Sequence, residues 1–158
     1  MELSAQLAPF VKATIKNLKD MLGFEVNTGG MEPEPDEFTS QGYTVLVGFT
    51  GGWKGRLILD MPGETAIKMA SAMTGEPYSS AGDEEVLLSG AELGNIIGGN
   101  AITEINNSQP GLQIRLTPPS VFTGMGMTMF NARVNSSSLV VNTDVGPVKV
   151  NVAVEGAQ

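Results

Sequence analysis

The segment from Asp83 to about Asn107 constrains the fold most, because its residue pattern predicts one long helix with two unlike sides. Its acidic start suits the positive end of a helix dipole, and Pro110-Gly111 follows it as a helix breaker. At about 100° per residue, one side is apolar and the other is polar or small. The apolar side consists of Val86, Leu87, Leu93, Ile97, Ala101 and Ile105. We therefore expect this helix to pack its apolar side on a β-sheet.

Glycines at positions 90, 94, 98 and 99 interrupt the same segment. Each costs a helix about 0.5–1 kcal/mol relative to alanine, so some other interaction must compensate. Gly90 and Gly94 lie toward the apolar side, where a missing side chain lets the helix approach the sheet closely. Gly99 lies on the polar side, where it leaves room for an approaching partner. The alternative is that all four glycines serve internal packing alone.

The chain before residue 83 is predicted to contain two further helices, a short strand and a loop. Apolar residues at helical spacing predict a first helix from about Leu3 to Leu22 and a second from Glu64 to Met73. Phe24–Thr28 fits a short strand. Met31–Glu37 holds two prolines and four acids, so we expect a solvated loop there.

The remaining β-rich runs predict an antiparallel sheet. Tyr43–Thr50 and Gly55–Asp60 flank Gly51-Gly52-Trp53, which is typical of a hairpin. Later runs are Leu112–Leu116, Val121–Thr123, Met125–Val134, Ser138–Thr143 and Val148–Val154. We expect turns at Asn135–Ser138 and Asp144–Pro147, and Pro147 favours an edge position for the last strand. The order of elements predicts a two-layer α+β fold, with long helices packed on an antiparallel β-sheet in one domain over residues 1–158.

Composition excludes several function classes. The chain has no cysteine and no histidine, so disulfides and thiolate metal sites are excluded and the commonest general base is absent. The net charge of −8 disfavours binding to nucleic acids and anionic membranes. The start of the chain lacks the basic and apolar regions of a secretory signal, and no apolar run reaches the roughly 20 residues of a membrane span. We expect a cytoplasmic protein that acts on another protein.

The main candidate site is the pair Glu92 and Asn95 on the polar side of the long helix. Residues at i and i+3 share a helix face, so both side chains can engage one partner. The same spacing recurs at Glu104 and Asn107, but Glu104 projects toward the apolar flank and Asn107 lies where the helix is about to end. We interpret this second copy as a chance match, with Asn106 or Asn107 near the C-cap.

The string Glu92-Leu-Gly-Asn95-Ile-Ile-Gly-Gly-Asn-Ala101, followed by Thr117-Pro-Pro-Ser-Val-Phe-Thr-Gly124, resembles the CheC/CheX/FliY family of bacterial chemotaxis phosphatases. The chain looks most like the CheX branch. The resemblance implies a CheC-like fold and hydrolysis of the phospho-aspartate of a CheY-like receiver domain, which is a response regulator of two-component signalling. It implies that Asn95 positions the attacking water and that Glu92 docks to the receiver's active-site lysine. It also implies Mg²⁺ in the receiver, no cofactor in this chain, and a homodimer joined at sheet edges.

The resemblance leaves one functional alternative and includes two departures. The alternative is a non-catalytic CheC-like scaffold that binds a receiver or a flagellar switch protein. Two-site relatives carry a second Glu-x-x-Asn in the first helix, where this chain has Thr14 and Asn17, so we expect one site. Relatives often have Asp or Ser four residues before the acid, where this chain has Leu88. We expect the following residue, Ser89, to be ordinary helix surface.

Overall fold

The computed structural model describes residues 5–34, 37–130 and 136–155. The helical elements are α1 (Ala8–Lys16), a short π-helix η1 (Asn17–Met21), α2 (Gly63–Thr74) and α3 (Glu84–Ser108). The strands are β1 (Val26–Glu34), β2 (Glu37–Thr39), β3 (Gly42–Thr50), β4 (Lys54–Pro62), β5 (Arg115–Leu116), β6 (Ser120–Thr123), β7 (Thr128–Phe130), β8 (Ser136–Thr143) and β9 (Gly146–Glu155). In the described part of the chain, no helix is long and apolar enough to span a membrane.

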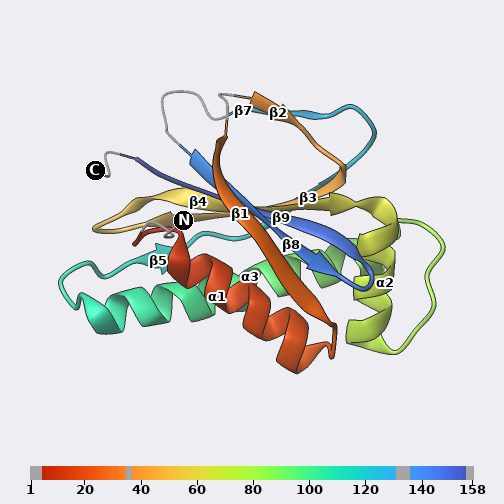
Figure 1. The fold of residues 1–158 in the computed structure, drawn as a ribbon, viewed down its shortest axis with the longest axis horizontal. Helices are drawn as coiled ribbons and strands as arrows, with labels where there is room; N and C mark the ends of the chain where they lie inside the picture. Colours follow the sequence, from red (N-terminus) through yellow and green to blue (C-terminus); the bar gives the residue numbers. More distant parts are fainter. Residues whose placement is uncertain (1–4, 35–36, 131–135, 156–158) are drawn as a thin grey trace.

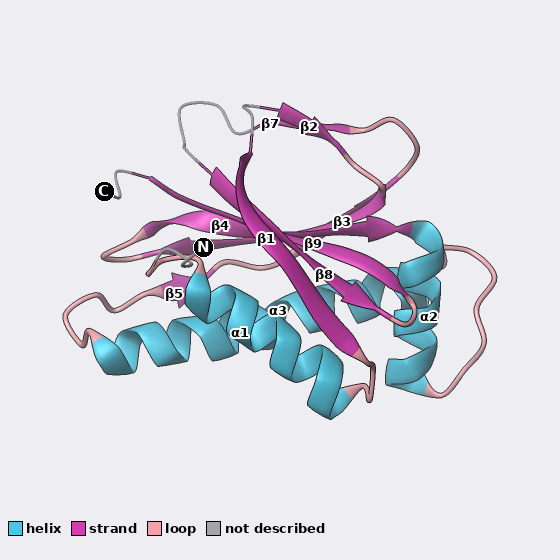
Figure 2. Cartoon of the chain, viewed as in Figure 1, coloured by secondary structure: helices cyan, strands magenta, loops and turns pink. Residues whose placement is uncertain are grey.

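A seven-stranded antiparallel sheet forms one layer of the molecule. Its strand order is β1-β8-β9-β4-β3-β5, and β6 pairs with β3 beside β5. The helices α1 and α3 lie on one side of this sheet, and the small β2–β7 ribbon lies on the other (Figure 1, Figure 2). This arrangement confirms the predicted two-layer α+β fold, the hairpin β3–β4 and the two later helices.

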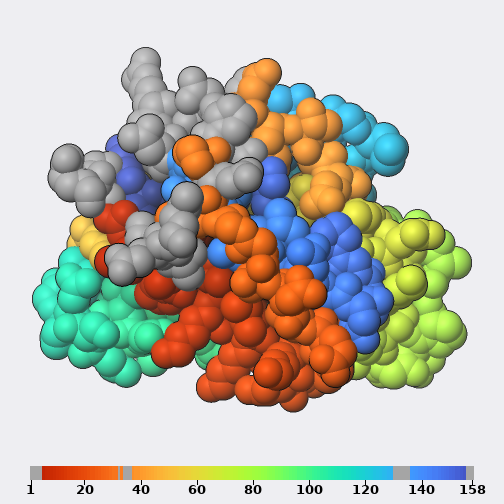
Figure 3. Space-filling model, in the orientation of Figure 1, coloured from red at the N-terminus to blue at the C-terminus, as the bar shows by residue number. Residues whose placement is uncertain are grey.

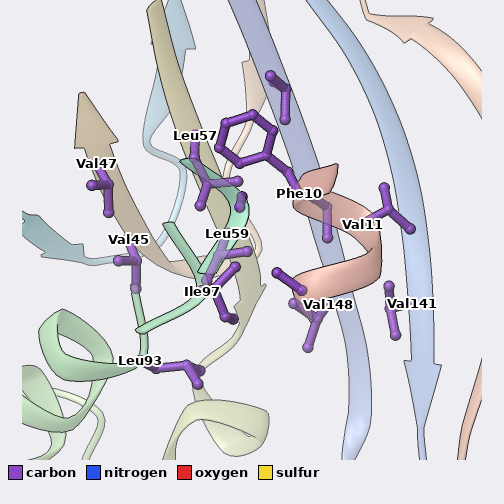
Figure 4. Close-up of a cluster of buried hydrophobic side chains, with 14 of the residues drawn as sticks. Phe10, Val11, Val45, Val47, Leu57, Leu59, Leu93, Ile97, Val141 and Val148 are labelled. Carbon is purple, nitrogen blue, oxygen red and sulfur yellow. The ribbon is translucent and has the colours of Figure 1, made fainter. Parts of the chain in front are cut away.

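One hydrophobic core joins the helices to the sheet. Phe10 and Val11 from α1 and Leu93 and Ile97 from α3 point toward strand residues such as Leu59 (Figure 4). The rings of Phe10 and Phe49 stack with their centroids 5.4 Å apart, which ties α1 to β3. In the space-filling view, α1 in red lies against the C-terminal part of α3 in teal (Figure 3). The core therefore fixes how α3 sits on the sheet.

Two predictions based on proline were wrong. The Met31–Glu37 segment is not one solvated loop, because β1 continues to Glu34 and β2 starts at Glu37, with 35–36 outside the described residues. β1 is an edge strand, and an edge strand tolerates proline because half of its N–H groups need no partner. β9 is not at an edge but lies between β8 and β4, and Pro147 is accepted because it follows the tight turn at the start of that strand.

Other element boundaries also differ from the predictions. The first helix begins at Ala8, after a turn over residues 5–7, while Leu3 lies outside the described residues. Of the predicted strand Met125–Val134 the structure shows β7, preceded by a turn in which Gly126 has a φ of 73°, and residues 131–134 lie outside the description. Residues 136–138 form the start of β8 instead of a turn, and Asn135 is not described.

Candidate functional site

Glu92 and Asn95 lie near the middle of α3, and both side chains are exposed. They are about 4.5 Å apart along the helix axis, one turn from each other on the same face. The structure thus shows the predicted pair open to solvent, on the side of α3 away from the buried residues such as Leu93 and Ile97. Among the described residues, none forms a side-chain hydrogen bond or ion pair with Glu92 or Asn95, so both are available to a partner.

Close packing against β3 holds this helix face in place. A Cβ atom added at Gly94 would lie 2.7 Å from Val45 Cγ1 and 2.9 Å from Val47 Cγ2. A Cβ atom at Gly90 would overlap the Tyr43 hydroxyl. The prediction that these two glycines allow a close helix–sheet approach is confirmed. The exposed face therefore sits on a support with little freedom to move.

Gly99 differs from these two glycines, because a Cβ atom there would meet no atom within 4 Å. Packing within the chain does not explain its presence, and alanine would favour the helix by about 0.5–1 kcal/mol. Gly99 lies on the same exposed stripe as Glu92 and Asn95. The alternative that all four glycines serve internal packing therefore fails at this position.

Hydrogen bonds fix α3 near both of its ends. The Tyr43 hydroxyl donates to the Val86 carbonyl oxygen at 2.6 Å, and burial raises the pKa of Tyr43 to about 12. At the other end, the Asn106 amide donates to the Ile114 carbonyl oxygen at 2.9 Å and accepts from the Ile114 N–H at 2.8 Å. Asp83 caps the helix by accepting from the Glu85 N–H at 2.9 Å. These contacts hold the helix that carries the site in one position.

Sequence reasoning missed Tyr43 and Asn106 as positioning residues. Each contacts a residue that is distant in sequence or lies beyond the end of the helix, so no periodic pattern marks it. The one available signal for Tyr43 was Gly90, a costly helix glycine that requires a bulky neighbour. For Asn106 the helix pattern predicted only a place near the C-cap, which is confirmed because Gln109 is the C-cap, whereas its hydrogen bonds to Ile114 had no signal in the sequence.

The second Glu-x-x-Asn copy is not arranged like the first. Glu104 Oε1 forms a salt bridge of 3.2 Å with Lys12 Nζ of α1. Its carboxylate thus already has a partner within the chain, whereas Asn107 is exposed just before the helix ends at Ser108. This difference agrees with the interpretation of the second copy as a chance match.

The first helix presents no comparable pair. Thr14 is buried and its hydroxyl donates to the Phe10 carbonyl oxygen at 2.7 Å. Asn17 is also buried, and its amide donates to the Ala13 carbonyl oxygen at 2.7 Å. Because both side chains face inward, α1 cannot offer them to a partner. The structure is thus consistent with the expectation of one site.

Ser89, which precedes Glu92 by three residues, differs from its prediction in being buried. Ser89 is not ordinary helix surface but is buried, and its hydroxyl donates to the Glu85 carbonyl oxygen at 2.8 Å. It borders a small cavity shared with Met69 and Ala70 of α2, so the neighbouring helix covers it. Leu88, by contrast, is 62% exposed.

The candidate site is an exposed helix face and not a pocket. A hollow of about 440 Å³ lies between α1 and the C-terminal half of α3, and neither Glu92 nor Asn95 lines it. Its lining includes Lys12, Lys16, Asn100 and Thr103. Among the described residues, no group of three or more acidic side chains is placed to hold a metal ion. Glu92 and Asn95 can supply one carboxylate and one carboxamide, so any reaction here must be completed by groups of a partner.

Comparisons with known proteins found relatives both by sequence and by structure. A family model described as "Chemotaxis phosphatase CheX" matches residues 43–144, which include α3 and both Glu92 and Asn95. The curated CheY-P phosphatase CheX of Thermotoga maritima is 31% identical over 114 residues, covering 72% of this chain and 72% of that protein.

Solved structures show the same fold. A chain of the CheX-CheY-BeF3-Mg²⁺ complex from Borrelia burgdorferi is 31% identical, has a TM-score of 0.80, and the match covers 95% of this chain and 97% of that one. The chemotaxis protein CheX from Desulfovibrio desulfuricans has a TM-score of 0.84 at 24% identity, with 95% and 99% covered. The second likeness supports the fold alone.

Proposed function

Since the chain belongs to the CheX family of chemotaxis phosphatases, which are aspartylphosphate phosphatases, we propose that it hydrolyses the phospho-aspartate of a CheY-like receiver domain through Glu92 and Asn95. The observation that supports these residue roles best is the exposure of both side chains on a firmly held face of α3. Such a face can enter the active site of another protein, whereas a pocket could not.

The role of Asn95 in this proposal is to orient water. Phosphoryl transfer has a loose transition state, so positioning and charge stabilisation account for most of the catalysis. A carboxamide has both a donor and an acceptor, which is sufficient to hold a water molecule in line with phosphorus. Correct placement alone is worth several kcal/mol. The lack of histidine and cysteine in the chain is therefore compatible with this reaction.

The role of Glu92 is to dock the receiver. A charge-assisted bond from its carboxylate to the receiver's active-site lysine contributes about 1.5–3 kcal/mol. The Mg²⁺ that balances charge on the phosphoryl group belongs to the receiver in this proposal, and the chain has no cofactor of its own. The Borrelia burgdorferi relative was solved with CheY, BeF3 and Mg²⁺, a combination consistent with this division, since BeF3 mimics a phosphoryl group.

Gly99 supports docking from the same face. Because its Cβ position is empty, the partner backbone can approach α3 one turn beyond Asn95 without meeting a side chain. We infer that this approach brings the receiver's phosphoryl group within reach of the water held by Asn95.

The assembly and location complete the proposal. One domain over residues 1–158 acts in the cytoplasm as a homodimer joined at a sheet edge. In the described sheet, β1 forms one edge and β5 with β6 forms the other. Unpaired N–H and C=O groups on such edges can pair with a second copy.

A phosphate-release assay with a phosphorylated CheY receiver from the same genome tests the residue roles. We expect Asn95→Ala to keep receiver binding and lose hydrolysis, and Glu92→Lys to lose binding. Asn107→Ala is the matched control, because it removes an exposed asparagine of the other motif copy on the same helix. Undiminished turnover by Asn95→Ala would overturn the mechanism, and binding without any turnover by the wild type would favour the non-catalytic scaffold.

A further inference from the structure

Leu88 is a large apolar side chain in contact with water on the helix that carries the site. Four large apolar residues are exposed among the described residues: Met21, Leu88, Phe122 and Met125. Of these, Leu88 is the one on α3, and 62% of it is exposed. Removing a leucine side chain from water is favourable, so the isolated chain forgoes much of that gain at Leu88.

The position of Leu88 relative to Glu92 is fixed by the helix. Leu88 precedes Glu92 by four residues, so it is about 6 Å away along the axis and about 40° away around it. Residues at this spacing lie one above the other on the same face. Leu88, Glu92, Asn95 and Gly99 therefore form one continuous stripe, which we call the docking stripe.

We propose that Leu88 is a hydrophobic docking residue that binds an apolar patch beside the phosphorylation site of the receiver, and this proposal rests on the proposed function. A stable protein interface covers about 800 Å² on each partner, which corresponds to a disc about 16 Å in radius. A receiver centred on Glu92 and Asn95 therefore covers Leu88. Once covered, a leucine favours an apolar surface, since a polar surface there loses its water contacts without replacement.

Leu88 acts on affinity and partner choice, not on the chemical step. Its side chain has no group that can transfer a proton or orient water, and it lies one turn away from Glu92 on the side opposite Asn95. Its contact is made equally in the bound state and in the transition state, so losing it raises KM and leaves kcat unchanged.

The test measures kcat and KM with a phosphorylated CheY receiver from the same genome, and affinity for that receiver in the presence of BeF3 and Mg²⁺. The variants are Leu88→Ser, Leu88→Asp and the conservative Leu88→Met. Met21→Ala is the control, because it removes an exposed apolar side chain from η1, outside the docking stripe. Thermal unfolding checks that all variants remain folded, which we expect because Leu88 is exposed.

We expect Leu88→Ser to raise KM and weaken binding about tenfold, which equals about 1.4 kcal/mol, with kcat unchanged. Leu88→Asp should weaken binding further, while Leu88→Met and Met21→Ala should match the wild type. Unchanged KM and affinity in Leu88→Asp would sink the inference even if Asn95→Ala abolishes hydrolysis. Loss of self-association in Leu88→Asp with unchanged receiver affinity would assign the residue to a contact between copies. Binding that depends on Leu88 without turnover in the wild type would instead refute the proposed hydrolysis and leave the docking role standing.

Discussion

Replacing Gly99 with alanine should make the protein more stable and less active at the same time. The added methyl group meets no atom within 4 Å, so the fold accepts it without rearrangement. Alanine favours a helix interior by about 0.5–1 kcal/mol relative to glycine. For a chain of this length, that change raises the midpoint of thermal unfolding by about 1–4 °C.

The loss of activity expected for Gly99→Ala comes from its contact with the proposed partner. If the receiver backbone packs against Gly99, one added methyl group overpacks the interface by about 1–3 kcal/mol. The corresponding fall in kcat/KM is about 5-fold to 150-fold. Gly94→Ala is the matched control on the opposite side of the helix, because its methyl group must displace Val45 and Val47 and should lower stability.

Thermal unfolding and steady-state phosphate release, measured on both variants, separate the two effects. Opposite signs of the stability change in Gly99→Ala and Gly94→Ala are expected. A Gly99→Ala protein with a raised midpoint and the kcat/KM of the wild type would falsify the claim that the receiver approaches α3 at this glycine.

Three further predictions concern the support of α3 and the assembly. Because burial raises the pKa of Tyr43 to about 12, against an ordinary value of 10, the folded state binds this proton more tightly, and the unfolding free energy should fall by about 2 kcal/mol as the pH rises from 10 to 12. Urea titrations should show this alkaline loss in the wild type and a flatter dependence in Tyr43→Phe; equal slopes would contradict the assignment. Asn106→Ala removes both hydrogen bonds to Ile114 and should lower the unfolding free energy by about 1–3 kcal/mol in the same titrations. An ordinary surface substitution changes stability by less than about 0.5 kcal/mol, so a loss below that value would show that these hydrogen bonds do not hold the end of α3. Size-exclusion chromatography with light scattering should show a dimer, and a monomer at all concentrations would remove the edge-pairing proposal.

The sequence pattern was sufficient to predict those elements whose structural determinants lie within one short segment. The helix α3 was predictable from sequence because its apolar spacing, its acidic start and its proline-glycine end all lie within the segment itself. The β3–β4 hairpin was predictable for the same reason. In both cases the sequence signal and the structural cause involve the same residues.

The failures occurred where a distant segment decides the outcome. Proline at 33 signals a loop locally, but pairing with β8 makes it part of an edge strand. Pro147 suggested an edge, but β4 supplies a second neighbour for β9. Ser89 lies at a polar position in the helix pattern, yet α2 covers it. None of these partners can be inferred from spacing within one segment.

The candidate site was predictable only in part. Exposure of Glu92 and Asn95 followed from helical projection, whereas their proposed roles came from the resemblance of the longer string to a family. The distinction between Gly94 and Gly99 was also partly visible, because the two fall on different sides of the projection. Its physical cause, contact with Val45 and Val47 at one position and none at the other, required the structure.

The hydrogen bonds near the two ends of α3 have a consequence for how fast the protein recognises its partner. With Tyr43 holding Val86 and Asn106 holding Ile114, the helix between them cannot fray or pivot without breaking one of these hydrogen bonds. Its amide protons should exchange with deuterium only through near-global opening. A preformed helix loses little conformational entropy on association, so under the proposed function encounter with the receiver requires no folding step. Selection among receivers then depends on surface match alone, and a receiver of the wrong shape cannot be accommodated by bending α3.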